Sequence, residues 1–232
     1  MLPLLHTQSL NAYPMTQIST FIFDLDGTLV DSVPDLAVAL NKTLVEFSLP
    51  THAEPVIRNW VGNGARVLVE RGLHAGMNTP KKEDIDNALV RFLHHYREAV
   101  CVHSALYKGV ENTLRTLHNQ GFNLALVTNK PFEFIAPILE AFSLTSLFCI
   151  TLGGDSLKEK KPSPMPLLHV CNELGVGVNQ CIMVGDSKND ILAAKAASMK
   201  SIGLTYGYNY GQDISQYNPD WVFDSFEEIL SL

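Results

Sequence analysis

The sequence predicts an α/β fold with a parallel sheet and a separate helical insertion. Two observations support this prediction. Short apolar runs alternate with helix-like segments over most of the chain, which is typical of βαβ units with parallel strands. Between residues 34 and 106 the alternation stops, and only the helical spacing of apolar residues remains. We therefore expect a Rossmann-like, doubly wound core with an inserted α-helical cap.

Six short apolar runs have the length and composition of buried strands. They are Ile18–Phe23, Leu124–Val127, Cys149–Leu152, Cys181–Val184, Ser201–Thr205 and Trp221–Phe223. Four helical patterns lie between them, at Glu111–Gln120, Pro131–Phe142, Pro164–Leu174 and Lys188–Ser198. Gly121 and Gly175 follow two of these patterns, and glycine is common just after the end of a helix. The order of elements thus predicts a sheet whose strands are joined by helices.

The inserted segment has a different pattern. Leu40, Leu44 and Phe47 recur at helical spacing, and similar spacing continues further along without a strand-like run. This pattern predicts a small helical bundle.

These patterns divide the chain into three parts. We expect a core domain made of residues 17–33 and 107–232, and a helical cap domain made of residues 34–106. Residues 1–16 lack the basic and long apolar regions of a signal peptide. We expect a disordered N-terminal extension there, or a misassigned start.

Composition and charge exclude several classes of protein. The chain has 232 residues, of which 46% are hydrophobic and 18% charged, as in globular proteins. A net charge of −7 argues against nucleic-acid binding, and means that an anionic substrate must be held by local cations or a metal. No apolar run approaches the roughly 18 residues of a membrane span. The four cysteines show no CxxC spacing, which favours buried thiols in a reducing compartment such as the cytoplasm.

Two aspartates follow directly after the first apolar run. Asp24 and Asp26 are two positions apart, and Gly27 can release the backbone from strand geometry at this point. The two carboxylates can then converge at the carboxyl end of a parallel strand, where ligands bind in open α/β sheets. The alternative is a solvated turn, since Asp-Gly is a common turn pair.

Three later segments decide between these alternatives. Thr128 and Asn129 end an apolar run, Lys161 precedes Pro162, and a further apolar run ends in Gly-Asp186-Ser-Lys-Asn-Asp190. In order and content, the four motifs resemble those of the haloacid dehalogenase (HAD) superfamily of phosphohydrolases. The resemblance covers nearly all of the chain from about residue 17, and it implies a helical cap between the first and second motifs.

The resemblance also implies a mechanism. Asp24 matches the nucleophile that forms an aspartyl-phosphate, and Asp26 matches the general acid and base. The expected metal is Mg²⁺, which takes hard oxygen ligands. By this resemblance it is held by Asp24, Asp186 and the backbone carbonyl of Asp26. A helix N-cap is the structural alternative for Asp186.

The remaining motif residues are expected to complete the site. Thr128, Asn129 and Lys161 would bind the phosphoryl oxygens, and Thr128 and Lys161 are counted among the catalytic residues. Asp190 lies one helical turn after Asp186, and we expect it to hold Lys161 or a metal-bound water rather than to bind the metal directly. The neighbouring Lys160 is expected to be solvated.

Longer stretches resemble the phosphoglycolate phosphatase branch of the superfamily. They are residues 61–65 with 68–71, residues 153–157 with 160–164, and residues 203–211. This likeness implies hydrolysis of 2-phosphoglycolate, a small phosphorylated metabolite, in the cytoplasm by a monomer or homodimer.

Within the cap, one loop is a candidate for substrate recognition. The backbone of Gly62, Asn63 and Gly64 could form an anion-binding nest at the start of a helix, with Arg66 as a second donor. A solvated Arg66 is an equal alternative. We expect Arg71 to form a local ion pair with the adjacent Glu70.

Other functions share parts of this pattern. A β-phosphoglucomutase, or a broad sugar-phosphate or nucleotide phosphatase, would have the same core and cap. Outside the enzymes, a phospho-aspartate receiver or a phosphate-binding module is disfavoured. A receiver has no helical insertion, and every position of the catalytic motifs is occupied here.

Overall fold

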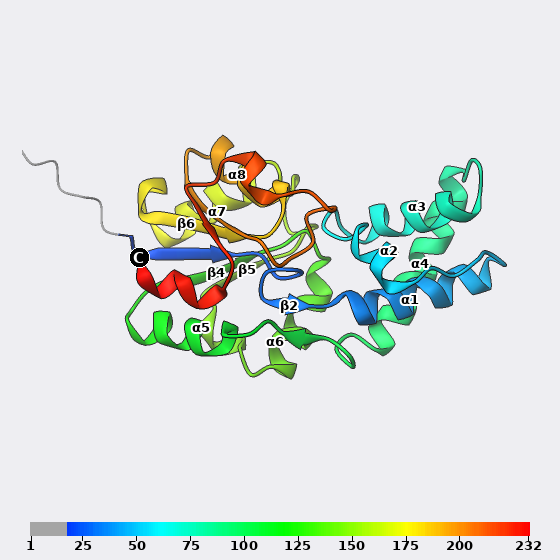
Figure 1. Ribbon diagram of the computed structural model, residues 1–232, viewed down its shortest axis with the longest axis horizontal. Coiled ribbons are helices and arrows are strands. Elements are labelled where there is room, and N and C mark those ends of the chain that lie inside the picture. The colour runs from blue at the N-terminus through cyan, green and yellow to red at the C-terminus, as the bar shows by residue number, and fades with distance from the viewer. Residues whose placement is uncertain (1–17) are drawn as a thin grey trace, which may run out of the picture.

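The computed structural model describes residues 18–232, so the expected N-terminal extension lies outside the described residues. Figure 1 shows a sheet with helices on both faces at one end of the molecule and a group of helices at the other. No helix of the described chain is long and apolar enough to cross a membrane.

The core contains one six-stranded sheet in which all neighbouring strands are parallel. Its strand order is β5-β4-β1-β6-β7-β8. The strands are β1 (Thr20–Phe23), β4 (Asn123–Val127), β5 (Ile150–Leu152), β6 (Cys181–Gly185), β7 (Lys200–Leu204) and β8 (Trp221–Phe223). The parallel α/β fold predicted from the sequence is therefore confirmed, and each expected strand is present within a few residues.

Helices cover both faces of this sheet, so alternate strand residues are buried on opposite sides. On one face, Phe23 and Leu126 pack with α5 (Val110–Asn119) and α6 (Ile135–Ala141). On the other face, Ile22 packs with helices α7 (Met165–Leu174) and α8 (Lys188–Ala196). Short 3₁₀ segments complete the core, at Phe132–Phe134, Thr145–Leu147, Val178–Gln180, Ile214–Tyr217 and Phe226–Ser231.

Four helices form the second group, and they have their own apolar core. They are α1 (Val33–Glu46), α2 (Glu54–Arg58), α3 (Ala65–Gly76) and α4 (Lys82–Glu98). Leu40, Leu73 and Phe92 are fully or almost fully buried in this core. Gly72 lets α3 approach α1, because a Cβ at this position would press against the side chain of Leu40. We refer to these helices as the cap.

The chain enters and leaves the cap through a short strand pair that sequence periodicity does not predict. Strands β2 (Val30–Asp31) and β3 (Ala105–Leu106) are antiparallel partners. Close by, the buried Asp35 carboxylate accepts backbone N–H bonds from residues 102–104 at 2.8–3.0 Å. Two-residue strands carry too few side chains to show an alternating pattern. These contacts tie the two connections between core and cap together.

Candidate active site

Three neighbouring strands in the middle of the sheet end in the polar residues that the sequence singled out. Asp24 follows β1, Thr128 follows β4 and Asp186 follows β6. Since these strands are parallel, their carboxyl ends meet at one edge of the sheet. Gly27 (φ +91°) turns the chain here, and a Cβ on it would collide with the Asp186 carboxylate.

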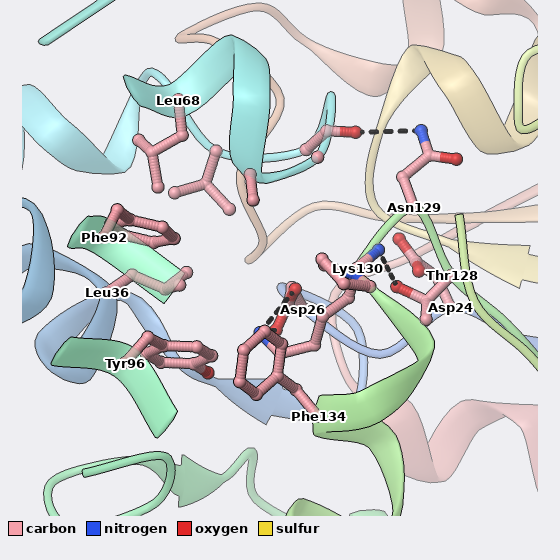
Figure 2. A pocket seen from close by; sticks show the side chains of 15 residues that line it. Asp24, Asp26, Leu36, Leu68, Phe92, Tyr96, Thr128, Asn129, Lys130 and Phe134 are labelled. Atoms are coloured by element: carbon pink, nitrogen blue, oxygen red, sulfur yellow. Dashed lines mark hydrogen bonds and ion pairs between the residues drawn. The ribbon is translucent and has the colours of Figure 1, made fainter. Parts of the chain in front are cut away.

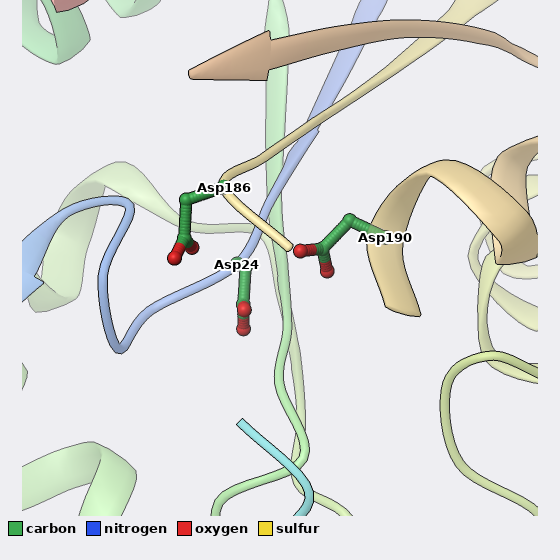
Figure 3. Close-up of side chains that lie close together, drawn as sticks. All are labelled: Asp24, Asp186 and Asp190. Atoms are coloured by element: carbon green, nitrogen blue, oxygen red, sulfur yellow. The ribbon is translucent and has the colours of Figure 1, made fainter. Parts of the chain in front are cut away.

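Three buried carboxylates converge at this edge. Oxygens of Asp24, Asp186 and Asp190 lie within 4.8 Å of one another, and Figure 3 shows their side chains directed toward a common region. Such an arrangement is repulsive unless a cation is nearby. Lys161 supplies one positive charge, with Nζ 2.6 Å from Asp190 Oδ1 and 3.0 Å from Asp24 Oδ1.

The three carboxylates differ in how they are held. Asp190 is fully satisfied, because Lys161 binds one oxygen while the hydroxyl and backbone N–H of Ser187 donate to the other, at 2.8 and 3.0 Å. Asp186 accepts from the Thr28 hydroxyl at 2.7 Å and from the backbone N–H of Tyr208 at 2.5 Å. These bonds fix both side chains in place.

Of the three carboxylates, Asp24 has the fewest hydrogen bonds within the protein. The Lys161 ammonium is close to its Oδ1 but poorly directed, so this buried oxygen has no hydrogen-bond partner among the described residues. Burial raises the pKa of Asp24 to about 6; Lys161 opposes this shift and Asp190 adds to it. Burial, Asp190 and Asp24 also raise the pKa of Asp186 well above its usual value.

These features fit a hard divalent cation. Asp24 and Asp186 offer buried carboxylate oxygens in a cluster whose negative charge exceeds that of its lysine, and Asp24 Oδ1 has no well-directed hydrogen bond. Oxygen-only donors favour Mg²⁺ over softer metals. Asp190 is less available as a ligand, because both of its oxygens are already in hydrogen bonds within the protein.

The segment after β4 places three more groups beside Asp24. The backbone N–H of Lys130 donates to the Thr128 hydroxyl at 3.2 Å. Asn129 Nδ2 donates to the carbonyl oxygens of Lys161 and Gly62, at 2.9 and 3.1 Å, and so links the core to the cap loop. Lys130 then turns its ammonium toward Asp26.

Asp26 lies in a polar environment separate from the three-carboxylate cluster. Lys130 Nζ is 2.9 and 3.1 Å from its two oxygens, and the Ser32 hydroxyl donates to Oδ1 at 2.5 Å. Burial alone would lower the pKa of Lys130, but the charge of Asp26 raises it above its usual value. The ion pair therefore holds Asp26 at the entrance of the site.

A pocket connects these groups with the cap. Asp24, Asp26, Thr128, Asn129 and Lys130 line it on the core side. Figure 2 shows the opposite wall, on which most side chains are apolar. The cap residues of that wall are Leu36, Val61, Gly62, Gly64, Ala65, Leu68, Phe92 and Tyr96. A substrate bound at Asp24 would thus lie between core and cap.

The candidate cap loop lies at this pocket, but its four residues differ in position. Gly62 and Gly64 line the pocket. The structure does not bring Arg66 to the pocket: its guanidinium pairs with Asp86 on α4, and 42% of its side chain is exposed. Asn63 is not among the residues that line the pocket; its side-chain Oδ1 accepts from Arg71 and its backbone carbonyl from Lys160.

Two expectations about neighbouring charges are wrong. Arg71 does not pair with Glu70; it donates to the Trp60 carbonyl at 2.5 Å and to Asn63 Oδ1 at 2.9 Å, because loop carbonyls lie within its reach. Lys160 is not solvated, since its ammonium donates to the Asn63 carbonyl at 2.8 Å. Its half-buried position lowers its pKa. Both cations hold the cap loop.

Sequence reasoning missed several residues of the site. Lys130 directly follows Thr128 and Asn129, which were predicted as site residues. Its position just after β4 could therefore have indicated that it also belongs to the site. Thr28 belongs to the first motif, where its β-propensity hides its role as a donor to Asp186. Tyr208 comes from a distant glycine-rich loop, and no local pattern indicates that its hydroxyl lies 2.5 Å from Asp31 at the cap connection.

Comparison with known proteins agrees with this fold. The family model described as "Haloacid dehalogenase-like hydrolase" matches residues 21–204. The chain belongs to the haloacid dehalogenase-like hydrolase family. The resemblance inferred from the four motifs is thereby confirmed.

Individual relatives are similar over nearly their whole length. A protein of Colwellia psychrerythraea named phosphoglycolate phosphatase is 52% identical over 90% of this chain and 94% of its own. One of Haemophilus influenzae with the same name is 47% identical over 94% of this chain and 99% of its own. The crystal structure of a predicted phosphoglycolate phosphatase from Haemophilus somnus superposes with a TM-score of 0.90 at 44% identity, covering 94% of this chain and 98% of the other.

Proposed function

We propose that this protein is a Mg²⁺-dependent phosphomonoesterase that hydrolyses 2-phosphoglycolate to glycolate and phosphate. The observation that carries the proposal is the buried Asp24 carboxylate, which lines the pocket and is held beside the Lys161 ammonium at 3.0 Å. A carboxylate beside a lysine suits attack on an electrophilic phosphorus. The names of the relatives at 47–52% identity support the choice of substrate.

In the first step, an oxygen of Asp24 attacks phosphorus and the bond from phosphorus to the ester oxygen breaks. The electron pair of that bond goes to the leaving oxygen, which takes a proton from Asp26. In the second step, Asp26 removes a proton from water, whose oxygen attacks the phosphorus of the aspartyl-phosphate. Phosphate leaves and the Asp24 carboxylate is restored.

Charge compensation makes these steps possible. Lys161, the Thr128 hydroxyl and the backbone N–H of Asn129 would bind the transferring oxygens. Mg²⁺, when bound by Asp24, Asp186 and the Asp26 carbonyl, would neutralise charge on nucleophile and phosphoryl group together. Asp190 would keep Lys161 in place through the 2.6 Å contact.

The cap would close over the small substrate and exclude water. Its loop already contacts the core through Gly62 and Asn63, and its inner wall is apolar. Exclusion of water strengthens the electrostatic interactions inside the site. We place this activity in the cytoplasm, and expect the protein to act as a monomer or homodimer.

Phosphate release from a panel of phosphate esters tests the proposal. The panel contains 2-phosphoglycolate, β-glucose 1-phosphate, a nucleoside monophosphate and p-nitrophenyl phosphate, each with Mg²⁺ and with a chelator. We expect the highest kcat/KM for 2-phosphoglycolate, no turnover with the chelator and none with Asp24→Asn. Preference for a sugar phosphate would contradict the proposed substrate, and activity in Asp24→Asn would contradict the mechanism.

A further inference from the structure

The pocket contains a single cationic side chain among its described lining residues, and this side chain is Lys130. The other charged groups on its wall are the carboxylates of Asp24 and Asp26. Opposite them, the cap presents mostly carbon atoms. A substrate with a second negative charge, besides its phosphoryl group, therefore finds few groups in this pocket that could bind that charge.

Lys130 is held where such a charge could reach it. Its ammonium lies 4.7 Å from the centre of the Tyr96 ring, on α4 of the cap, and it forms the ion pair with Asp26 on its other side. Only 4% of Lys130 is exposed. It therefore occupies the border between the phosphoryl site of the core and the wall of the cap.

A second polar group lies beside it. The hydroxyl of Tyr96 is buried and is paired with no described residue in a well-directed hydrogen bond, although the Lys130 ammonium is near enough to interact with it. Buried hydroxyls are normally hydrogen-bonded, so an unpaired one on a pocket wall indicates a polar atom of a ligand. Tyr96 and Lys130 both line the pocket, and Figure 2 shows the Tyr96 ring close to Phe134.

We propose that Lys130 and the Tyr96 hydroxyl bind the carboxylate of the substrate, and that Lys130 thereby determines specificity for phosphorylated hydroxy acids. This inference rests on the proposed function, and it assigns recognition to the core lysine rather than to Arg66. The phosphoryl group would lie at Asp24 and the carboxylate at Lys130. A few bonds separate the two charges of phosphoglycolate, which suits one pocket lined by both residues.

The same ammonium contacts the proposed general acid, Asp26. Loss of Lys130 would therefore slow all substrates by a common factor through Asp26, and slow a carboxylate-bearing substrate further. A ratio of two substrates removes the common factor. Ethyl phosphate is the matched substrate without the second charge, because a methyl group replaces the carboxylate of phosphoglycolate.

The test is the ratio of kcat/KM for 2-phosphoglycolate to kcat/KM for ethyl phosphate. We expect Lys130→Met to lower this ratio about 100-fold, and Tyr96→Phe to lower it about tenfold, from the strength of hydrogen bonds to charged groups. Lys130→Arg should keep part of the preference. The control Lys200→Met, at an exposed position at the start of β7, should leave the ratio unchanged.

Equal losses on both substrates in Lys130→Met would contradict the inference and leave Lys130 with only a role in positioning Asp26. A wild-type enzyme without preference for phosphoglycolate would contradict the proposed substrate as well. If Lys130→Met does not fold, the pair Asp26→Asn and Asp26→Asn/Lys130→Met removes the unpaired carboxylate. Calorimetry then compares these two variants. The double variant should bind phosphoglycolate more weakly than Asp26→Asn does and should bind ethyl phosphate equally well. If the two variants bind phosphoglycolate with the same affinity, the inference is overturned.

Discussion

Lys161 Nζ lies 2.6 Å from Asp190 Oδ1, and both side chains are almost completely buried. Burial lowers the pKa of Lys161, but Asp190 and Asp24 outweigh it and keep the pKa above its usual value. The ammonium is therefore charged at neutral pH. Asp190 holds this ammonium 3.0 Å from Asp24 Oδ1.

Removal of Asp190 should damage both stability and activity. Asp190→Ala leaves the buried ammonium with one poorly directed partner, and losing one member of a buried pair costs about 3–5 kcal/mol. We expect a fall in the free energy of unfolding of that size and a fall in kcat of about 100-fold or more. Denaturant titration and steady-state kinetics measure the two effects. Asp190→Asn, which keeps an acceptor, should lose less of both; equal losses would show that charge alone matters.

Metal binding should depend on pH through Asp24. Its raised pKa means that the folded state binds a proton more tightly than the unfolded state does. Without metal, this carboxyl therefore contributes stability at low pH that is lost as the pH rises through about 6.

Mg²⁺ should replace this lost stability at neutral pH. At one fixed concentration, about 100 times the Kd measured at about pH 7.5, we expect the metal to raise Tm by about 5–10 °C at that pH and by much less at about pH 5, where protonation of Asp24 raises the Kd. Differential scanning fluorimetry measures both shifts, with Asp186→Asn as the control that should show a reduced effect. The same Tm shift at both pH values would place the metal away from Asp24.

Asp26→Asn should separate the two chemical roles of the aspartates. An amide cannot protonate the leaving oxygen, so the first turnover of phosphoglycolate should slow by about 10²–10⁴-fold. p-Nitrophenolate leaves without a proton, and quenched-flow measurement should show a much smaller loss for its phosphate ester. If both esters lose rate equally, Asp26 does not act as the acid.

Gly64 should be required for closure of the cap loop. At φ +90° its Cβ position lies 3.0 Å from both the Asn129 carbonyl and Lys160 Nζ, so Gly64→Val would push the loop away from the core. We expect kcat/KM to fall at least tenfold on every phosphate ester, because the displaced loop would misplace the substrate relative to the catalytic groups. Gly121→Val is the matched control: φ there is +87°, and open space surrounds it. Equal kinetic losses in both variants would assign the effect to backbone strain alone.

Much of the fold could be predicted from local pattern. The strand before Asp24 and the strand before Asp186 are short apolar runs that end in carboxylates, and buried parallel strands leave this signal. The two-residue strands at Val30 and Ala105 leave none, because they are defined by their partner rather than by their own sequence.

The site shows the same division. Residues inside the motifs could be predicted, whereas the contacts of Lys130, Lys160 and Arg71 depend on which loops meet in space. Arg66 is a residue for which the sequence pattern was misleading. Its position in the sequence suggested that it lines the pocket, but its guanidinium forms an ion pair with Asp86 on the neighbouring helix.

Trapping of the covalent intermediate tests the central claim most directly. Asp26→Asn should slow hydrolysis of the aspartyl-phosphate, so p-nitrophenyl phosphate with Mg²⁺ should leave a phosphoenzyme that accumulates. Acid quenching, borohydride reduction and peptide mass spectrometry then locate the modified carboxyl. We predict modification of Asp24, absent in Asp24→Asn. A modified residue elsewhere, or phosphate release with no trapped intermediate, would contradict the assignment of Asp24 as the nucleophile.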